Sequence, residues 1–488
     1  MRDEHRREGA RRLRTRGASH RGQWRPAAGG EWVDVVDPAT TRPLGKVADA
    51  TVDDAVAALD AAAAAQASWA ATPARQRGEI LRRCFELMNE RVDELALLVT
   101  LEMGKPIAES AAEVKYAAEF FRWFSEEAVR ISGRWSDEPN GAGRLLTMKQ
   151  PVGPCLLITP WNFPLAMGAR KIGPAIAAGC TMVVKPAQLT PLSNNLMVSL
   201  LVEAGLPPGV VNVITASSAS RVIKPIIGDR RLRKLSFTGS TEVGKTLVEQ
   251  SAGNLLRLSM ELGGNAPFLV FEDADLELAV EQAVVAKMRN MGESCVAANR
   301  FYAHESVAEE FAERLGAALA ALPVGRGTEP GVKVGPLIDE KQRGKVVELV
   351  GDAVRRGAKV LTGGGVPERE GYFFTPTVLT AVPTEAAMHR EEIFGPVAPV
   401  YPFRTDDEAL RLANDTEYGL VAYAFTRDLR RSLRVVEGLE SGMVGLNKGL
   451  VSNPAAPFGG VKWSGMGREG GPEGIEEYLS TKYAGIAG

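Results

Sequence analysis

The stretch VGPCLLITP (residues 152–160) is the first of four short apolar runs that decide the fold. The other three are TMVVKP (181–186), VVNVIT (210–215) and RKLSFT (233–238). Each run is rich in leucine or β-branched residues, has the length of a strand, and is followed by a segment of helical character. Short strands that alternate with helices predict a parallel, doubly wound sheet, and therefore an α/β fold.

Helices are expected on the N-terminal side of these runs. The segment TVDDAVAALDAAAAAQASWAA (51–71) predicts a helix with Thr51 as its N-cap and acids in its first turn. Two further helices are expected, one at about 73–102 and one that ends near Gly133. On the C-terminal side, the alternation restarts at APFLVF (266–271) and predicts a second α/β domain. No low-complexity linker separates the two domains, so we expect them to pack closely.

The composition is typical of an ordinary soluble globular protein. The chain has 488 residues, of which 45% are hydrophobic and 24% charged, and its formal net charge is -2. This charge gives no sign of a polyanion-binding surface, so no nucleic acid partner is expected. Apolar runs without charges stay shorter than a membrane span, so no membrane partner is expected either.

Residues 1–30 are predicted to form a basic, disordered tail. The first 25 residues are rich in arginine and lack the apolar centre of a secretory signal. An organellar transit peptide is the alternative, and Asp3, Glu4 and Glu8 count against it.

Cysteines and histidines are few and scattered. The cysteines are Cys84, Cys155, Cys180 and Cys295, and the histidines are His5, His20, His304 and His389. No pair has the spacing of a metal site or a redox motif, so neither a metal nor a disulfide scaffold is expected. This usage indicates a reducing compartment, and we expect a cytoplasmic protein.

One short motif points to nucleotide hydrolysis. GSTEVGKT (239–246) matches the G-x-x-x-x-G-K-[ST] pattern of a phosphate-cradling P-loop. A strand-like run precedes it and a helical segment follows, as that motif requires. A later run that ends in acids, FLVFEDAD (268–275), is of the kind that binds magnesium. Taken alone, the motif leaves a P-loop NTPase open.

Four other stretches carry candidate chemistry, although none decides by itself. They are TPWNFPLAMGARKIGP (159–174), SMELGGNAPF (259–268), NMGESCVAANR (290–300) and EEIFGPVAPV (391–400). A lone cysteine is more often packed than reactive. A single acid beside two glycines is more often a solvated turn residue than a catalyst.

Together, these stretches resemble the aldehyde dehydrogenases, from about Glu31 to Tyr483. MELGGNAP and RNMGESCVAANR look like the glutamate and cysteine signatures of that family. PWNFP, FTGSTEVG, EEIFGPV and NPAAPFGGVKWSGMGREGG (453–471) also occur in the expected order. Six ordered motifs outweigh one eight-residue pattern, so the P-loop match is interpreted as chance. By resemblance, Lys245 and Thr246 are then surface residues of a helix.

The resemblance implies a Rossmann-type cofactor domain, an α/β catalytic domain and a small β oligomerisation element. The expected bounds are 31–131 with 151–263, then 264–463, and 132–150 with 464–488. Members of the family are dimers or tetramers, so a homodimer or homotetramer is expected.

The resemblance also implies a mechanism. Cys295 is the expected nucleophile, Asn162 and the Cys295 backbone N–H stabilise the oxyanion, and Glu261 is the general base. Glu293 departs from the family, which usually has glutamine there. A carboxylate close to the thiol would raise its pKa. Ala297 stands where some members have a second cysteine, so no redox switch is expected.

For the cofactor, the resemblance places Lys185 at the adenosine ribose, Ser240 at the pyrophosphate and Glu392 at the nicotinamide ribose. The other expected contacts are Trp161, Gln188, Gly239, Leu262 and Phe394. NAD-selective members usually carry glutamate where this chain has Gln188. A neutral amide does not repel a 2′-phosphate, so NADP is expected, with NAD possible.

For the substrate, Arg170, Arg289 and Ser452 resemble the residues that hold the far carboxylate in succinate-semialdehyde dehydrogenases. An arginine in an apolar tunnel is costly without an anion. The alternative is that either arginine makes a structural salt bridge. The expected substrate is a small semialdehyde, succinate semialdehyde first, with glutarate semialdehyde, another ω-oxo acid or a general aldehyde as alternatives. A catalytically silent member of the family lacks support, since nucleophile, base and oxyanion donor are all present.

Overall fold

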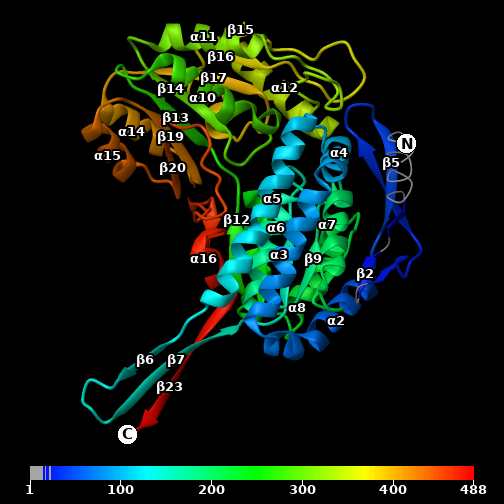
Figure 1. Cartoon of the computed structure of the whole chain (residues 1–488). Helices are drawn as coiled ribbons and strands as arrows, with labels where there is room; N and C mark the ends of the chain where they lie inside the picture. Colours follow the sequence, from blue (N-terminus) through cyan, green and yellow to red (C-terminus); the bar gives the residue numbers. More distant parts are fainter. Residues whose placement is uncertain (1–14, 17, 21–22) are drawn as a thin grey trace.

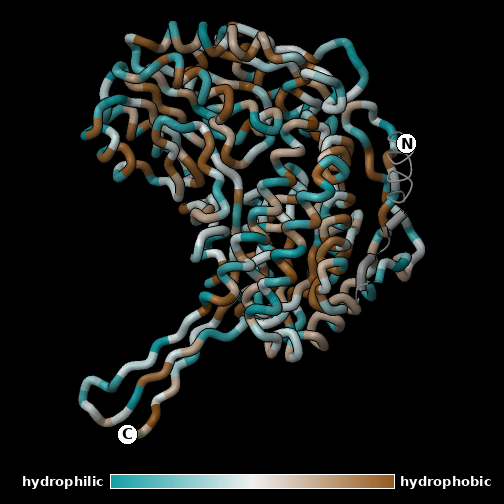
Figure 2. The backbone as a smooth tube through the Cα atoms, viewed as in Figure 1, coloured by the Kyte–Doolittle hydropathy of each residue, from teal (hydrophilic) through white to brown (hydrophobic). Residues whose placement is uncertain are grey.

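Two β-sheets with their helices form the two halves of the molecule, and a narrow three-stranded arm projects from the first half (Figure 1). This is a computed structural model, and it describes residues 15–16, 18–20 and 23–488. Apolar residues are concentrated inside the halves, whereas the arm mixes polar and apolar positions (Figure 2).

The first half is built on an eight-stranded sheet with the order β22-β12-β11-β8-β9-β10-β2-β3. Five central strands run parallel, as the apolar runs predict: β8 (Cys155–Ile158), β9 (Met182–Lys185), β10 (Val211–Val213), β11 (Lys234–Thr238) and β12 (Arg257–Glu261). The antiparallel edges are β22 (Gly465–Met466), β2 (Ala18–His20) and β3 (Gln23–Arg25).

Helices cover both faces of this sheet. One face carries α3 (Ala74–Glu90), α4 (Val92–Met103), α5 (Ile107–Glu127), α6 (Ala166–Ala178) and α7 (Pro191–Glu203). The other carries α2 (Val52–Ala71), α8 (Ala219–Gly228) and α9 (Thr241–Ser251). Successive residues of β8 alternate between the two cores, because side chains alternate along a strand.

The predicted N-cap of α2 is confirmed. Thr51 Oγ1 accepts from the Asp54 N–H at 3.3 Å, and the Asp54 carboxylate accepts from the Thr51 N–H at 3.0 Å.

The second half contains a seven-stranded sheet with the order β15-β16-β17-β14-β13-β19-β20. Its strands are β13 (Ala266–Val270), β14 (Ala298–His304), β15 (Lys359–Thr362), β16 (Thr377–Thr380), β17 (Val397–Phe403), β19 (Val421–Phe425) and β20 (Met443–Leu446). Only β15 runs antiparallel to its neighbour in the described sheet. Its helices are α10 (Leu276–Met288), α11 (Ala308–Ala320), α12 (Glu340–Arg355), α13 (Ala387–Arg390), α14 (Asp406–Asn414) and α15 (Leu429–Gly438).

The arm consists of β6 (Arg134–Asp137), β7 (Gly143–Pro151) and β23 (Leu479–Ala487). β23 pairs antiparallel with β7 along its whole length, from Leu479 opposite Pro151 to Ala487 opposite Gly143. Residues 464–478, which we expected in the same element, lie elsewhere. β22 extends the first sheet beside β12, and α16 (Gly471–Glu476) packs on α6. Within residues 464–488, β23 is therefore the strand that belongs to the arm.

The expectation of a disordered tail falls partly outside the described residues, namely on 1–14, 17 and 21–22. The described part of that segment contains β1 (Thr15–Arg16), β2 and β3. β1 pairs with β5 (Arg42–Ala48), β2 pairs with β10, and β3 pairs with β2. β5 also pairs with β4 (Trp32–Asp37). Trp24 Nε1 donates to Ser199 Oγ on α7 at 3.2 Å, so the described part is attached to the first half. Among the described residues, no helix has both the length and the hydropathy to cross a membrane.

Candidate active site

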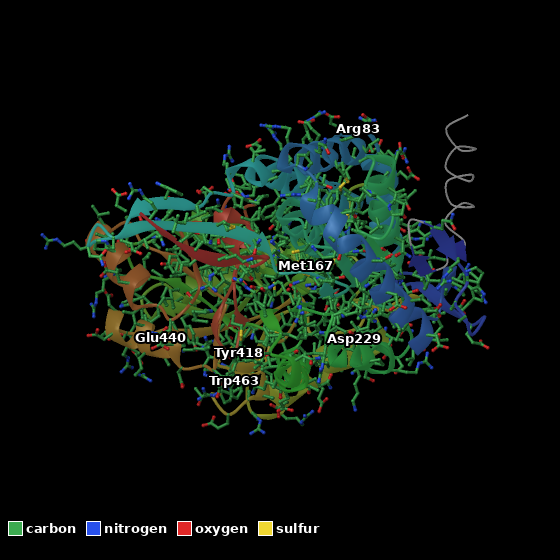
Figure 3. The ribbon with its side chains drawn as sticks, turned by 90° about the horizontal axis from the view of Figure 1, so that it is seen from below. Arg83, Met167, Asp229, Tyr418, Glu440 and Trp463 are labelled. Carbon is green, nitrogen blue, oxygen red and sulfur yellow. The ribbon has the colours of Figure 1, made fainter. Side chains whose placement is uncertain are left out.

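A pocket with about 240 Å³ of empty space lies where the two halves meet. Its lining residues are Tyr116, Phe163, Met167, Arg170, Arg289, Ser294, Cys295, Val296, Ser452 and Phe458. Met167 marks the place: it lies near the centre of the molecule when seen from below (Figure 3). The pocket therefore brings together four residues that the sequence singles out from distant segments: Cys295, Arg170, Arg289 and Ser452.

The loop that carries Cys295 has an unusual backbone. After α10, a short turn, η3 (Arg289–Gly292), places Asn290 and Met291 at φ of 54° each, in the left-handed region that non-glycine residues rarely adopt. Gly292 follows at φ 79°, and a Cβ there would lie 2.2 Å from the Gly395 carbonyl oxygen. Such strain persists only where neighbouring contacts hold it.

Hydrogen bonds from the first half hold this loop. Asn290 Nδ2 donates to the Asn162 carbonyl at 3.0 Å and to the Glu293 carbonyl at 2.8 Å. The Asn290 backbone N–H donates to Glu109 on α5 at 2.7 Å. The position of the Cys295 loop is therefore fixed by residues on both sides of the boundary between the halves.

Cys295 is the one half-buried cysteine of the chain, because Cys84, Cys155 and Cys180 are fully buried. Burial raises the pKa of its thiol to about 12, and Glu392 and Glu261 add to this effect while Arg170 and Arg289 oppose it. The thiol is thus protonated at neutral pH. A nucleophilic role requires a base that removes the proton.

Asn162 follows β8 and presents its side-chain amide to the Cys295 loop. Its Nδ2 donates one N–H to the Glu293 carbonyl at 3.2 Å, and its Oδ1 accepts from the Phe163 N–H at 3.1 Å, which fixes the orientation of the amide. Within the described part of the chain, the Cys295 backbone N–H makes no hydrogen bond. The second Asn162 N–H and this backbone N–H are thus two donors, one on the turn after β8 and one on the Cys295 loop, and an oxyanion requires donors of this kind.

A buried ion pair that the sequence did not reveal supports Asn162. Lys105 Nζ lies 2.6 Å from Glu113 Oε2 and donates to the Asn162 carbonyl at 2.8 Å, and both side chains are almost fully buried. Glu113 also accepts from the Leu165 and Ala166 N–H groups at the start of α6. The pair joins α5, the Asn162 turn and α6.

Glu261 ends β12 and is buried with one carboxylate oxygen, Oε2, that has no hydrogen-bond partner among the described residues. Burial raises its pKa well above the ordinary value, and Glu469 raises it further, while Arg170 and Lys171 oppose this. A carboxyl with a raised pKa is a stronger base, as proton removal at neutral pH requires.

The two predicted carboxylate-binding arginines differ in their partners. Arg170 is buried, forms a close ion pair with Glu469 and stacks 4.0 Å from the centre of the Phe458 ring. The structural salt bridge that the sequence left open is therefore present for Arg170, although its side chain still lines the pocket. Arg289 makes no ion pair within the described residues; it donates to Ser452 Oγ at 3.3 Å and lies 4.8 Å from the Phe163 ring centre.

The predicted cofactor residues gather at the carboxyl ends of the first sheet's strands, where α/β proteins bind dinucleotides. Ser240 caps α9, and its Oγ accepts from the Val243 N–H at 3.5 Å. Gly239 precedes it, and a Cβ there would lie 2.5 Å from the Phe237 ring. The N-terminus of α9 thus offers N–H groups and a positive dipole to a phosphate.

The other cofactor residues lie around the same edge. Trp161 and Phe394 meet edge to face, 5.4 Å between ring centres, and Glu392 Oε1 accepts from the Gly264 N–H at 3.2 Å. Burial raises the pKa of Glu392 to about 7 and lowers that of Lys185 to about 8. The last two predicted contacts are Gln188, half-buried between β9 and α7, and Leu262, which follows β12.

The P-loop interpretation does not fit this geometry. Lys245 Nζ stacks 3.3 Å from the centre of the Trp463 ring, and Thr246 Oγ1 donates to the Glu242 carbonyl one turn earlier at 3.1 Å. Both side chains are engaged along α9, so they cannot act as phosphate and magnesium ligands there.

Glu293 does not act on the thiol as its position in the sequence suggests. Its Oε1 accepts from the Ile338 N–H at 3.1 Å, in the loop before α12, and burial raises its pKa well above the ordinary value. The charged groups with the largest effect on the Cys295 pKa are Arg170, Glu392, Glu261 and Arg289. Burial therefore disfavours a negative charge on Glu293, and the Ile338 N–H holds its Oε1.

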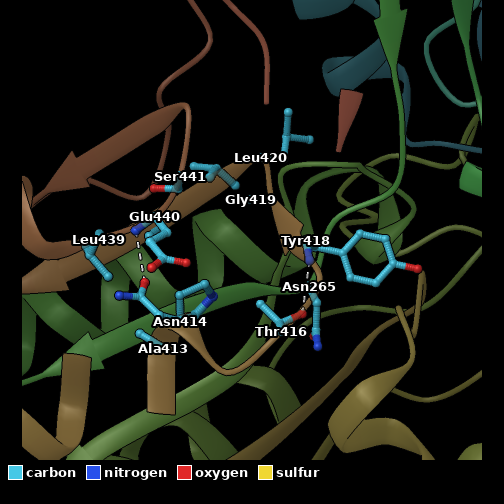
Figure 4. A pocket seen from close by; sticks show the side chains of 13 residues that line it. Asn265, Ala413, Asn414, Thr416, Tyr418, Gly419, Leu420, Leu439, Glu440 and Ser441 are labelled. Carbon is cyan, nitrogen blue, oxygen red and sulfur yellow. Dashed lines mark hydrogen bonds between the residues drawn. The ribbon is translucent and has the colours of Figure 1, made fainter. Parts of the chain in front are cut away.

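A second cavity, also of about 240 Å³, lies in the second half beside β19 (Figure 4). None of the predicted site residues lines it. Its central amide is already satisfied, because Asn414 Oδ1 accepts from the Glu440 N–H at 2.9 Å and Asn414 Nδ2 donates to the Gly438 carbonyl at 2.8 Å. It therefore offers no comparable chemistry.

Comparison with known proteins shows the family of the chain. Residues 24–484 match the description "Aldehyde dehydrogenase family". The chain is 60% identical over 444 residues to a succinate-semialdehyde dehydrogenase of Paenarthrobacter nicotinovorans, which covers 91% of this chain and 99% of the relative. It is 50% identical over 466 residues to a glutarate-semialdehyde dehydrogenase of Pseudomonas putida, with 96% of each chain covered. The crystal structure of an NADP-dependent enzyme of Escherichia coli superposes with a TM-score of 0.96 at 50% identity, covering 98% of this chain and 99% of the other.

We predict that iodoacetamide modifies a single thiol of the folded chain, Cys295, at a rate that rises about tenfold per pH unit between about pH 7 and 9. The thiolate is the reactive form, and a pKa of about 12 keeps its fraction growing through this range. Mass spectrometry of timed samples measures the rate, with Cys295→Ser as the control. A plateau below pH 9 would contradict the raised pKa.

Proposed function

The chain belongs to the aldehyde dehydrogenase family, and we propose that it oxidises succinate semialdehyde to succinate, with NADP as the preferred hydride acceptor and NAD as an alternative. The observation that carries this proposal is the pocket in which Cys295 lies together with Arg289, a cation that makes no ion pair among the described residues. The succinate-semialdehyde dehydrogenase at 60% identity supports it.

Arg289 gives the reason for a carboxylated substrate. A guanidinium in a pocket with aromatic walls has lost much of its hydration, and an anion that binds it restores the lost interaction. Arg289 and Ser452 are already hydrogen-bonded to each other and can turn toward one carboxylate. An uncharged aldehyde would leave this cation unpaired.

In the first chemical step, Glu261 accepts the proton of the Cys295 thiol. The thiolate then adds to the aldehyde carbon, and the carbonyl oxygen becomes an oxyanion. Asn162 Nδ2 and the Cys295 N–H donate to that oxygen. These donors are positioned before the reaction, because the Asn162 amide is fixed by its bonds to Phe163 and Glu293.

The residues at the edge of the first sheet fit a nicotinamide dinucleotide. The N-terminus of α9 with Ser240 would hold the pyrophosphate, Glu392 the nicotinamide ribose, and Trp161 and Phe394 would flank the ring. The dinucleotide, when bound, would supply the acceptor for a hydride. The tetrahedral adduct on Cys295 becomes a thioester when it loses that hydride. After Glu261 has passed the thiol proton to solvent, it takes a proton from water, and the resulting hydroxide adds to the thioester carbon. The C–S bond then breaks, succinate is released, and the Cys295 thiolate takes the proton back from Glu261.

Lys185 and Gln188 favour the 2′-phosphate of NADP. Lys185 Nζ donates to the Pro186 carbonyl at 3.1 Å and makes no ion pair among the described residues, so a phosphate can engage it. Gln188 lies three residues further along and carries no charge that would repel that phosphate. The solved NADP-dependent relative supports this preference.

Glutarate semialdehyde is the second candidate substrate, because a relative of that name is 50% identical to this chain. It has one more methylene than succinate semialdehyde, a difference worth only about 1–3 kcal/mol in a pocket. Both aldehydes carry the far carboxylate that the pocket requires, so both belong to the same chemical class.

We also propose that the chain forms a homodimer or homotetramer through its arm. The arm exposes apolar side chains on both faces: Trp135 and Ile486 share one face by register, and Tyr483 lies on the other, with exposed fractions of 61%, 40% and 60%. A ribbon of so few strands has little core of its own and gains stability from a partner surface.

The compartment is proposed from the cysteines of the chain. All four are free, which suits a reducing compartment such as the cytoplasm.

The substrate is tested with Arg289→Met, which keeps an apolar side chain of similar length. We expect KM for succinate semialdehyde to rise about 10- to 100-fold, because a charged hydrogen bond is lost. The kinetics with butanal should stay unchanged. NADPH absorbance measures both, with Arg122→Met on the exposed side of α5 as the control. Equal activity of the unsubstituted enzyme toward both aldehydes would sink the proposal.

The cofactor preference is tested with Gln188→Glu. We expect kcat/KM for NADP to fall about tenfold or more, since a carboxylate repels the 2′-phosphate, while kcat/KM for NAD is kept or improved. Gln76→Glu, on the exposed face of α3, is the matched control. A parallel loss with both dinucleotides would show that the residue does not discriminate between them.

The assembly is tested with the double variant Trp135→Asp and Tyr483→Asp. Light scattering after gel filtration should give two or four times 52.3 kDa for the unsubstituted chain and a smaller species for the variant, because charges disfavour apolar contact. A monomeric unsubstituted chain is the contrary result.

A further inference from the structure

Tyr116, on α5, is a pocket residue to which neither the motifs nor the mechanism gives a role. Its side chain lines the cavity that holds Cys295, and its ring packs edge-on against Phe120 with 5.0 Å between centres. Its hydroxyl is fully buried and makes no well-aligned hydrogen bond among the described residues. A buried hydroxyl without a partner is costly, so it is expected to serve a ligand or a function.

Tyr116 lies beside every residue assigned to the carboxylate end of the pocket. The Arg289 guanidinium is 5.7 Å from the centre of its ring. Ser452 and Arg170 are close enough to the hydroxyl to lower its pKa, although neither makes a well-aligned hydrogen bond with it. Tyr116 comes from the first half, whereas Arg289 and Ser452 come from the second. The phenol thus faces the two second-half residues across the pocket.

The neighbours of Arg170 increase the importance of this hydroxyl. Arg170 is bound to Glu469, lies over Phe458 and donates to Met167 Sδ at 3.2 Å, so several of its interactions are already used. Arg289 and Ser452 can supply donors to a carboxylate from one side. The Tyr116 hydroxyl on α5 would add a third donor to the two carboxylate oxygens, because each of these oxygens accepts more than one hydrogen bond.

Burial raises the pKa of the Tyr116 hydroxyl above its ordinary value, although Arg170 and Arg289 oppose this shift. The phenol therefore keeps its proton at neutral pH and remains a donor. Its ring is held by Phe120 and by the helix, so little side-chain freedom is lost when a ligand binds.

We propose that the Tyr116 hydroxyl donates a hydrogen bond to the far carboxylate of the substrate, alongside Arg289 and Ser452, and that it sets the preference for ω-oxo acids over uncharged aldehydes. This inference rests on the proposed function, because it deepens the account of the same pocket. It makes Tyr116 a specificity-determining residue that touches the substrate away from the reacting carbon.

The test is Tyr116→Phe, which removes one oxygen and keeps the ring. Its matched control is Tyr401→Phe: Tyr401 also has a buried hydroxyl without a hydrogen bond among the described residues, but it lies in β17, away from the pocket. For both variants and the unsubstituted enzyme, kcat and KM are measured with succinate semialdehyde and with butanal, the four-carbon aldehyde that lacks the carboxylate. The inhibition constant of succinate is measured alongside.

We expect Tyr116→Phe to raise KM for succinate semialdehyde and the inhibition constant of succinate about tenfold or more, with kcat within about twofold. Butanal kinetics and the Tyr401→Phe control should be unchanged. Equal losses with both aldehydes would mean that the hydroxyl has a structural role, and no change at all would mean that it does not contact the carboxylate. Either result overturns the proposal for Tyr116. A lack of preference in the unsubstituted enzyme instead overturns the proposed function itself.

Discussion

The hydrogen bonds between the Asn162 turn and the Cys295 loop are the constraint on which the site depends. Asn290 reaches the Asn162 carbonyl from the second half, and the Asn162 amide reaches the Glu293 carbonyl from the first. These bonds hold a strained backbone, and the same network sets the distance between Cys295 and the Asn162 amide. The buried pair of Lys105 and Glu113 supports the same turn from behind, so a change in either half would move the reacting groups.

Loss of hydration explains most of the site's electrostatics. The same burial raises the pKa of Cys295 to about 12, raises that of Glu261, and moves Glu392 to about 7 and Lys185 to about 8. In each case burial favours the uncharged form of the side chain. Exclusion of water therefore raises the pKa of the Cys295 thiol and that of the Glu261 carboxyl alike, and the described residues contain no metal-binding cluster.

Local features of the fold could be predicted from the sequence, and long-range partners could not. The strand runs from 152 to 238 and the Thr51 cap follow from patterns within a few residues. The ion pair of Arg170 with Glu469 joins residues about 300 positions apart, and no local pattern reports such a pair. Tyr116 was missed for the same reason: on a helix, its position looks like that of any core aromatic. The segment 464–478 was wrongly expected in the arm, because the pairing of β22 with β12 is a tertiary contact that the local sequence does not show.

The chance P-loop match separates two properties that a motif combines. A glycine and a helix N-terminus attract phosphate wherever they occur, because free N–H groups and the helix dipole do not depend on the rest of the pattern. The specific chemistry of an NTPase requires that the lysine and hydroxyl point back into the loop. Here the lysine stacks on Trp463 and the hydroxyl bonds to its own helix. The N-terminus of α9 therefore still offers N–H groups and a positive dipole to a phosphate, whereas Lys245 and Thr246 do not point back to hold a phosphate and a magnesium ion. The direction of these two side chains distinguishes the two functions.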